Sequence, residues 1–282
     1  MTEKLARFHL YRYQLLPVNR FFQGDMYGAT SIEELISRKN EFFQEALNSE
    51  DIFKTTRTNT TTKKLFERDD FILYRVAVNR ALNHETKDFK TEVIENWPKI
   101  LVAVWNKPNK QLIAVQHRTA AFQSTDAVVK LIFNSIEPIL SKRQLTAVSD
   151  PLFEKHVFWD LIKQNVGKVQ EIEFEIITPN MANISGTLPD NLKDFARATN
   201  AVRSKIEISS EKSNALKIDE NNTTIAGLVD YTSEGGGDIS IKISGFKKKI
   251  HTSKTVKEVV IDEASLVGEP DAVAAILKDL LS

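Results

Sequence analysis

The strongest charge pattern in the sequence is a lysine run near the C-terminus. Residues 240–257 hold six lysines and no aspartate or glutamate. Gly245 predicts a turn, so these cations would project from a hairpin tip, where they could neutralise phosphates and release their counterions. The alternative is a solvated loop whose lysines protect a strand edge. The lysines that we predict to contact nucleic acid are Lys242, Lys247, Lys248, Lys249, Lys254 and Lys257.

A second basic segment, residues 54–68, is rich in threonine. Hydroxyl groups together with cations suit the backbone of a nucleic acid. The same composition also fits a plain exposed loop or the exposed edge of a sheet. The cations assigned to this second patch are Lys54, Arg57, Lys63 and Lys64.

Gly235, Gly236 and Gly237 could let a phosphate approach the backbone closely. In phosphate-binding loops, however, glycines connect a strand to a helix N-terminus. Here the expected order is helix, glycines, strand, and the dipole at a helix C-terminus favours cations. We therefore expect the glycines to end a helix and to form a flexible joint.

Three glutamates, Glu171, Glu173 and Glu175, alternate along one predicted strand and share a face. Carboxylates in this arrangement can bind a hard cation such as Mg²⁺. A nuclease of the PD-(D/E)xK kind would need an acidic-x-Lys pattern beside them, and the sequence has none there. An exposed strand face is the expected role.

The chain has no cysteine, which excludes disulfides, thiolate zinc sites and cysteine nucleophiles. Its five histidines lack zinc-binding spacing, and no G-x-S-x-G nucleophile elbow is present. His84 and His117 lie near a predicted β-meander and are the candidates for an active site, although such histidines are more typical of ordinary surface groups. We expect no catalytic residue, no metal and no cofactor.

Composition sets the broad class. The 282 residues include 38 Lys+Arg, 38 Asp+Glu and 41% hydrophobic residues, enough for a sizeable core. This excludes a mostly disordered chain, and zero net charge argues against a wholly basic nucleic-acid binder. The start of the chain has no signal-peptide pattern, and no apolar stretch is long enough to cross a membrane. A cytoplasmic protein without membrane insertion is expected.

Apolar periodicity predicts the elements of the first half. Ser31 and Glu34 have the S-x-x-E spacing of a capping box, and Asp150-Pro151 is typical of a helix start. The expected elements are a strand over 8–18, a helix over 32–47, an exposed edge over 54–68, a meander with strands at 72–79, 100–105 and 111–116, and helices over 125–141 and 150–165.

From residue 168 the predicted order is β-α-β-β-α-β, as in the ferredoxin-like, split βαβ sandwich. Its elements would be strands near 172–176, 205–209, 215–218 and 239–243, with helices over 188–202 and 221–234. A strand at 255–261 and a helix at 271–281 would extend it. We predict an α+β fold with two domains: residues 1–166, a β-meander with helices, and residues 167–282, a ferredoxin-like sandwich with an extra strand and helix.

Two segments, RFHLYRYQLLPV (7–18) and LVDYTSEGGGDISIKI (228–243), resemble uncharacterised bacterial and phage proteins from anti-phage defence or exclusion loci. The resemblance implies a mid-sized cytosolic α+β protein, a role in antiviral defence and a nucleic acid as partner. It transfers no catalytic residue.

These observations predict a non-enzymatic, homo-oligomeric protein that binds nucleic acid largely independently of sequence, because lysines on a tip reach no base edges. We expect DNA rather than RNA. One alternative is a protein-binding subunit or adaptor of a multi-protein defence complex, whose exposed strands pair with a partner chain. The other is a metal-dependent nuclease, with carboxylates from Asp150, Glu171, Glu173 and Asp230.

Overall fold

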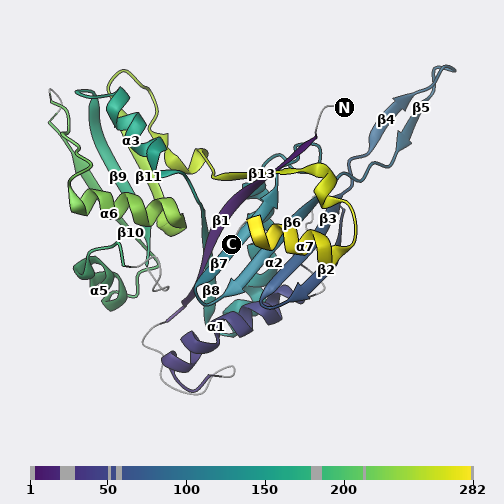
Figure 1. Ribbon diagram of the computed structural model, residues 1–282, viewed down its shortest axis with the longest axis horizontal. Coiled ribbons are helices and arrows are strands. Elements are labelled where there is room, and N and C mark those ends of the chain that lie inside the picture. The colour runs from purple at the N-terminus through teal and green to yellow at the C-terminus, as the bar shows by residue number, and fades with distance from the viewer. Residues whose placement is uncertain are drawn as a thin grey trace.

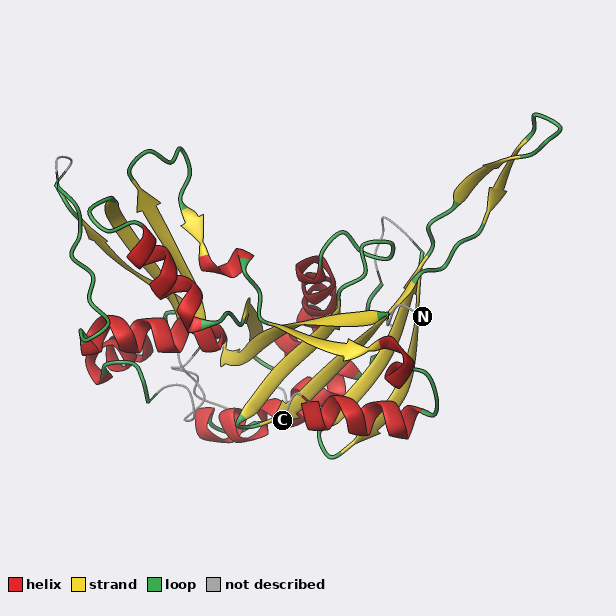
Figure 2. Ribbon diagram, turned by 45° about the horizontal axis from the view of Figure 1, so that its top comes forward, coloured by secondary structure: helices red, strands yellow, loops and turns green. Residues whose placement is uncertain are grey.

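The computed structural model describes residues 4–19, 29–49, 52–54, 59–178, 186–211 and 214–280. Antiparallel sheets and helices build an α+β fold in this part of the chain (Figure 1). A seven-stranded sheet and a four-stranded sheet lie side by side, and a two-stranded hairpin projects from the larger one (Figure 2). The predicted fold class, α+β, is confirmed.

The large sheet has the strand order β13-β1-β7-β6-β3-β2, and β8 pairs with the C-terminal half of β1. All of its pairs are antiparallel. Its strands are β1 (Leu5–Pro17), β2 (Thr60–Arg68), β3 (Phe71–Val78), β6 (Lys99–Lys107), β7 (Lys110–Gln116), β8 (Leu145–Pro151) and β13 (Glu258–Asp262). The predicted strand at 8–18, the exposed edge and the hairpin of β6 and β7 are confirmed.

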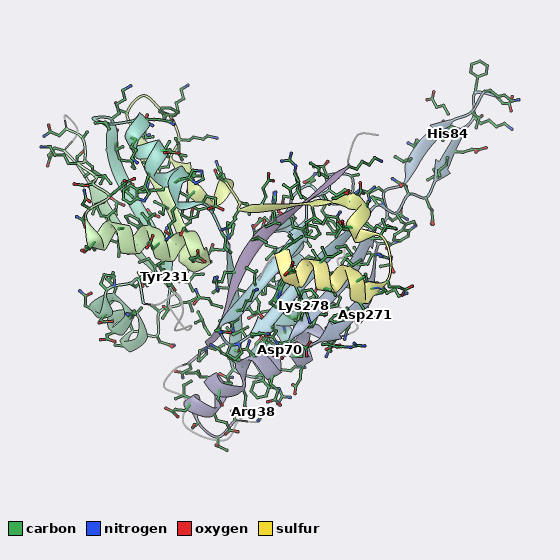
Figure 3. All side chains as sticks on the ribbon, viewed as in Figure 1. Arg38, Asp70, His84, Tyr231, Asp271 and Lys278 are labelled. Carbon is green, nitrogen blue, oxygen red and sulfur yellow. The ribbon has the colours of Figure 1, made fainter. Side chains whose placement is uncertain are left out.

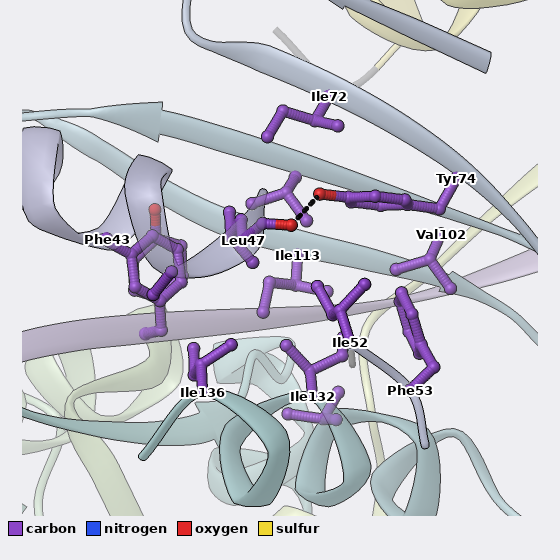
Figure 4. Packing of buried hydrophobic residues seen from close by; sticks show 14 of the residues in the cluster. Phe43, Leu47, Ile52, Phe53, Ile72, Tyr74, Val102, Ile113, Ile132 and Ile136 are labelled. Carbon is purple, nitrogen blue, oxygen red and sulfur yellow. Dashed lines mark hydrogen bonds between the residues drawn. The ribbon is translucent and has the colours of Figure 1, made fainter. Parts of the chain in front are cut away.

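Helices cover both faces of the large sheet, which explains why its central strands are apolar on both sides. α1 (Ile32–Leu47) and α2 (Thr125–Lys142) pack on one face, and α7 (Pro270–Leu280) packs on the other (Figure 1). In the first core the Tyr74 hydroxyl donates a hydrogen bond of 2.9 Å to the backbone oxygen of Leu47 (Figure 4). Tyr74 thereby buries its ring without leaving its hydroxyl unpaired.

The start of α1 confirms the predicted cap with one difference. The Ser31 hydroxyl accepts from the Glu34 amide at 3.2 Å. The Glu34 carboxylate reaches one residue beyond the N-cap and accepts from the Thr30 amide at 2.7 Å and the Thr30 hydroxyl at 2.6 Å. These hydrogen bonds lower the pKa of Glu34. Thr30 and Ser31, the two residues that precede the helix, therefore take part in the hydrogen bonds that cap its N-terminus.

The small sheet has the order β10-β9-β11-β12. Its apolar face packs against α3 and α6, and its other face carries the alternating glutamates. Its strands are β9 (Val169–Ile177), β10 (Arg203–Ser209), β11 (Gly237–Ile243) and β12 (Ile250–His251). Its helical segments are α3 (Lys155–Gln164), α5 (Asp190–Ala198), α6 (Thr223–Tyr231), the π turn η1 (Thr232–Gly236) and the 3₁₀ turn η2 (Thr252–Lys254).

The predicted helix start at Asp150-Pro151 is wrong. Both residues belong to β8, where Asp150 lies opposite Arg12 and Pro151 opposite Tyr11 of β1. β13 pairs with only Leu5–His9 of the long strand β1, and residues 145–151 satisfy their backbone groups on the rest of that edge, opposite β7. The helix begins later, at Lys155, and Gly167 follows its end in a left-handed conformation, as expected.

The ferredoxin-like order is not confirmed. Residues 215–218 form no strand, and the hydrogen bond from Leu216 to the Val169 oxygen, 2.8 Å, ties them to β9. In the described small sheet β9 pairs antiparallel with both β10 and β11, whereas the split βαβ arrangement contains parallel neighbours.

The C-terminal segment returns to the large sheet. β13 pairs with β1, and the 3₁₀ turn η3 (Glu263–Leu266) and α7 follow it on the same face. The predicted boundary between residues 166 and 167 stays a prediction. None of the described helices is both long and apolar enough to cross a membrane.

Candidate nucleic-acid interface

The predicted lysine run lies around the turn between β11 and β12, and Gly245 takes the expected left-handed conformation there. The Lys249 ammonium pairs with the carboxylates of Glu171 and, at 3.5 Å, of Glu173. The hydrogen bond to Glu171 raises the pKa of Lys249. The charge of this lysine is therefore offset by the acidic stripe of β9.

Two more lysines of the run contact their own chain. The Lys242 ammonium donates to the Phe246 backbone oxygen at 3.0 Å, and Lys257 pairs with Glu154 at 3.2 Å. Lys247, Lys248 and Lys254 are exposed, and no described residue forms an ion pair with them. Half of the run thus remains available for an external anion.

The second predicted patch is also divided. Lys64 contacts Asn48 and pairs with Glu67 at 2.6 Å. Lys54 is exposed, and Arg57 lies outside the described residues. Lys63 is exposed on the edge strand β2, directly opposite Arg75 of β3. This pair belongs to a cluster that the sequence analysis did not find.

Four cations gather at one end of the large sheet, on the face that also holds α7. Lys63 and Arg75 are opposite each other, and Lys99 lies on β6 two positions from Leu101, the residue paired with Arg75. The Arg118 guanidinium, just after β7, donates to the Lys99 backbone oxygen at 3.1 Å. We call Lys63, Arg75, Lys99 and Arg118 the basic cluster.

The basic cluster surrounds a pocket of about 340 Å³. Three of its members, Arg75, Lys99 and Arg118, line that pocket, together with Gln116 and a single carboxylate, Glu263. Among the described residues, none of the four cations has an ion-pair partner within 4.0 Å. The cluster therefore has an excess of positive charge that the described chain does not neutralise.

The cluster was missed because its members come from three strands and a loop. Only Lys63 stands in a visibly basic segment. One local signal was present: Arg75 interrupts the otherwise apolar strand β3 after Phe71 and Leu73, which are buried on the same face. A cation at such a position indicates that this end of the face is open to solvent.

The three glycines end the helical run of α6 and η1, as predicted, and the flexible joint stays a prediction. Gly235 is left-handed, with φ +79°, and a Cβ atom there would lie 2.4 Å from the Arg12 Cβ. A Cβ atom on Gly237 would lie 1.8 Å from the Glu175 backbone oxygen. The glycines let η1 pack between the two sheets, so they serve packing rather than phosphate binding.

Buried polar groups connect the two sheets near η1. The Tyr231 hydroxyl, placed at the end of α6 (Figure 3), donates to the Ile177 oxygen at 2.8 Å. Arg12 pairs with Glu234 at 3.3 Å, and Asp150 pairs with Arg203 at 3.1 Å. Burial raises the pKa of Asp150 to about 6, although Arg203 acts in the opposite direction.

This shift makes the stability of the protein depend on pH through Asp150. The folded chain holds the Asp150 proton more tightly than the unfolded chain, so stability falls as the pH rises through about 6. We expect Asp150→Asn to increase the free energy of unfolding by about 2 kcal/mol at pH 8 and by much less at pH 4.5. Urea unfolding at both pH values measures the difference, and an equal effect at both would contradict it.

The acidic stripe brings Glu171 and Glu173 together with Glu207 of β10, their carboxylate oxygens within 4.8 Å of one another. Lys205 pairs with Glu173 at 2.8 Å, and this hydrogen bond lowers the pKa of Glu173. The nuclease hypothesis also required Asp150 and Asp230. Asp150 pairs with Arg203 and Asp230 with Lys155, so the four carboxylates form no single cluster.

His9 and His117 contact each other and neighbouring side chains. His117 stacks on His9 at 4.7 Å between ring centroids, and His9 Nδ1 lies 2.8 Å from the Thr125 hydroxyl. Burial is the main cause that lowers the pKa of His9. The Thr125 hydroxyl also lies 2.7 Å from the Tyr11 hydroxyl. Thr125 is only 4% exposed, so a substrate could not reach the Thr125 hydroxyl in this conformation. His84 lies on the projecting hairpin (Figure 3).

That hairpin, β4 (Leu82–Glu85) and β5 (Thr91–Ile94), connects β3 to β6 and extends away from the body (Figures 1 and 2). We call residues 80–97 the arm. Its base adjoins the basic cluster, because Lys99 begins the strand that follows it. The arm was not predicted from the sequence, because its strands are only four residues each.

No protein-family model, curated protein or solved structure matches the chain. Function is therefore inferred from the residues and their geometry.

Proposed function

We propose that the protein binds the sugar–phosphate backbone of nucleic acid, DNA in preference to RNA, without catalysing a reaction. The observation that carries the proposal is the basic cluster. Its four cations come from neighbouring strands and lack carboxylate partners among the described residues. Lys63 was predicted from the sequence, and Arg75, Lys99 and Arg118 join it in the fold.

Unpaired cations on one surface suit phosphate better than cations already in ion pairs. Each phosphate that they neutralise releases condensed counterions, which supplies most of the affinity in nonspecific binding. A lysine such as Lys249 would first have to leave Glu171 and Glu173. Lys247, Lys248 and Lys254 need no such exchange, and we assign them a secondary role.

The basic cluster lies on a sheet face that is partly covered by η3, and no described helix projects from it toward base edges. Contacts to phosphate position a nucleic acid without reading its sequence. We therefore propose binding that is largely independent of sequence. The resemblance of two segments to defence proteins leads us to place this binding in antiviral defence.

Fluorescence anisotropy with a labelled duplex tests the proposal. If four cations each neutralise one phosphate, a plot of log K against log salt has a slope of roughly −3 to −4 between about 50 and 200 mM salt. Two duplexes of unrelated sequence should bind within about threefold of each other. Absence of binding at 50 mM salt would overturn the proposal. Hydrolysis of the duplex that requires Mg²⁺ would favour the nuclease alternative instead.

A second candidate function, a protein-binding subunit or adaptor, is favoured by the arm. Phe89 at its tip is 100% exposed, and Leu82, Val93 and Trp97 are also exposed. Exposed apolar side chains grouped on one projection are typical of protein contacts. The two functions are compatible, because the exposed apolar residues of the arm are distinct from the four cations of the basic cluster.

A further inference from the structure

Arg80 fixes the base of the arm to the Ala121 backbone oxygen at 2.7 Å, but the strands β4 and β5 pair only with each other among the described strands. Residues 82–95 form a two-stranded ribbon that is exposed almost throughout. An isolated hairpin of this length is only marginally stable in water. Val93 is 69% exposed and Phe89 fully exposed, so the ribbon presents apolar surface to solvent. Both facts indicate that the arm is completed by a contact with another molecule.

The tip holds Phe89 outward. The Thr86 amide donates to the Lys90 oxygen at 2.9 Å, and the Phe89 amide donates to the Thr86 oxygen at 3.0 Å. Phe89 is left-handed, with φ +56°, which is uncommon for a residue of this type. Charges of both signs, Lys87, Asp88 and Lys90, surround the aromatic ring in sequence.

An apolar groove lies at the other end of the molecule, between α3 and residues 215–221. Its volume is about 600 Å³, and its lining includes Trp159, Ile162 and Leu216. Val166, at its edge, is 77% exposed. The charged residues that line it are also of both signs: Lys163, Lys217, Asp219 and Glu220.

We propose that the arm of one copy inserts Phe89 into this groove on a second copy, head to tail. The arm and α3 lie at opposite ends of the long axis, so an arm would serve another molecule rather than its own groove (Figure 1). Glu220 is already paired with Lys163 at 2.8 Å, so Lys87 or Lys90 can face Asp219, and Asp88 can face Lys217. Such a contact uses two different surfaces and repeats, giving a ring or an open chain of copies.

The size of the arm sets the expected affinity of the contact between two copies. A standard interface uses roughly 20–30 residues from each partner, and the projecting part of the arm offers only residues 82–95. One arm in one groove is therefore a small interface, and the assembly should depend on concentration in the micromolar range. This inference does not depend on the proposed function, because it needs no nucleic acid.

Sedimentation velocity of the full chain, without nucleic acid, tests the inference. The wild type should pass from monomer to dimer and larger species between about 1 and 200 µM. Phe89→Asp removes the arm contact, and Val166→Asp removes the groove contact. Both positions are exposed, so the variants should fold, and circular dichroism verifies this. Phe246→Asp, which alters another exposed phenylalanine (51% exposed), is the matched control and should assemble like the wild type.

Mixing the two variants gives the decisive result. Each variant alone should remain monomeric, whereas the equimolar mixture should form a 1:1 dimer and nothing larger, because only one intact arm and one intact groove can meet. A monomeric wild type at 200 µM, a mixture that stays monomeric, or variants that assemble like the wild type would overturn the inference. If the wild type is monomeric and Phe89→Asp weakens duplex binding, the arm contacts nucleic acid instead.

Discussion

Neutralising the basic cluster should weaken duplex binding by roughly 100- to 1000-fold at 100 mM salt. The variant combines Lys63→Gln, Arg75→Gln, Lys99→Gln and Arg118→Gln. A phosphate that loses its protein cation keeps its condensed counterions. The slope of log K against log salt should therefore become less negative by about 0.9 for each residue replaced. Glutamine keeps much of the side-chain length, and Lys63, Lys99 and Arg118 are exposed, so the fold should persist. Anisotropy measures the affinity and circular dichroism verifies the fold.

The matched control removes the unpaired lysines of the C-terminal run. The Lys247→Gln/Lys248→Gln/Lys254→Gln variant loses three exposed cations from the turn after β11 and its connection to β13. We expect its affinity for the duplex to fall by less than about tenfold, because these lysines have only a secondary role. A large loss of duplex affinity in this variant and none in the cluster variant would contradict this expectation. It would show that the lysine run is the main interface.

Gly237→Ala should lower the free energy of unfolding by about 3 kcal/mol or more. The new methyl group would lie 1.8 Å from the Glu175 backbone oxygen, and that oxygen belongs to a paired strand that cannot move alone. Relief of the clash would separate β11 from β9 at the point where η1 enters the small sheet. Urea unfolding of the two proteins measures the difference.

Gly245→Ala separates backbone conformation from packing. Gly245 also has a positive φ, +89°, but a Cβ atom there would meet nothing within 4 Å. Only the cost of the positive φ remains, so Gly245→Ala should lower the free energy of unfolding by about 1 kcal/mol. Equal losses for the two variants would show that the contact with Glu175 does not determine the cost at Gly237.

Elements with local periodic patterns were predictable from the sequence. The alternation around Phe174 predicted β9 with its glutamates on the polar face, where they are half-buried, and the signals at Ser31 and Gly167 predicted a helix start and a helix stop. These patterns depend on neighbours within a few residues. Strand pairing depends on residues far apart in the sequence, and this is why the predicted ferredoxin-like order was not confirmed.

The errors have physical causes in particular residues. Asp150-Pro151 is locally a good helix start, but the unpaired part of β1 provides a competing set of backbone hydrogen bonds. Lys249 looks free in the sequence, because Glu171 and Glu173 are about 80 residues away along the chain. The basic cluster has the opposite character: Arg75 and Lys99 look isolated until the sheet brings them together.

Site-specific crosslinking tests most directly whether the basic cluster is the phosphate interface. The chain has no cysteine, so a single Lys99→Cys or Lys248→Cys substitution places one photoactivatable group at a known position. We expect crosslinks to a bound duplex from position 99, and far fewer from position 248. Crosslinks from position 248 alone, or from neither position while the duplex remains bound, would contradict it.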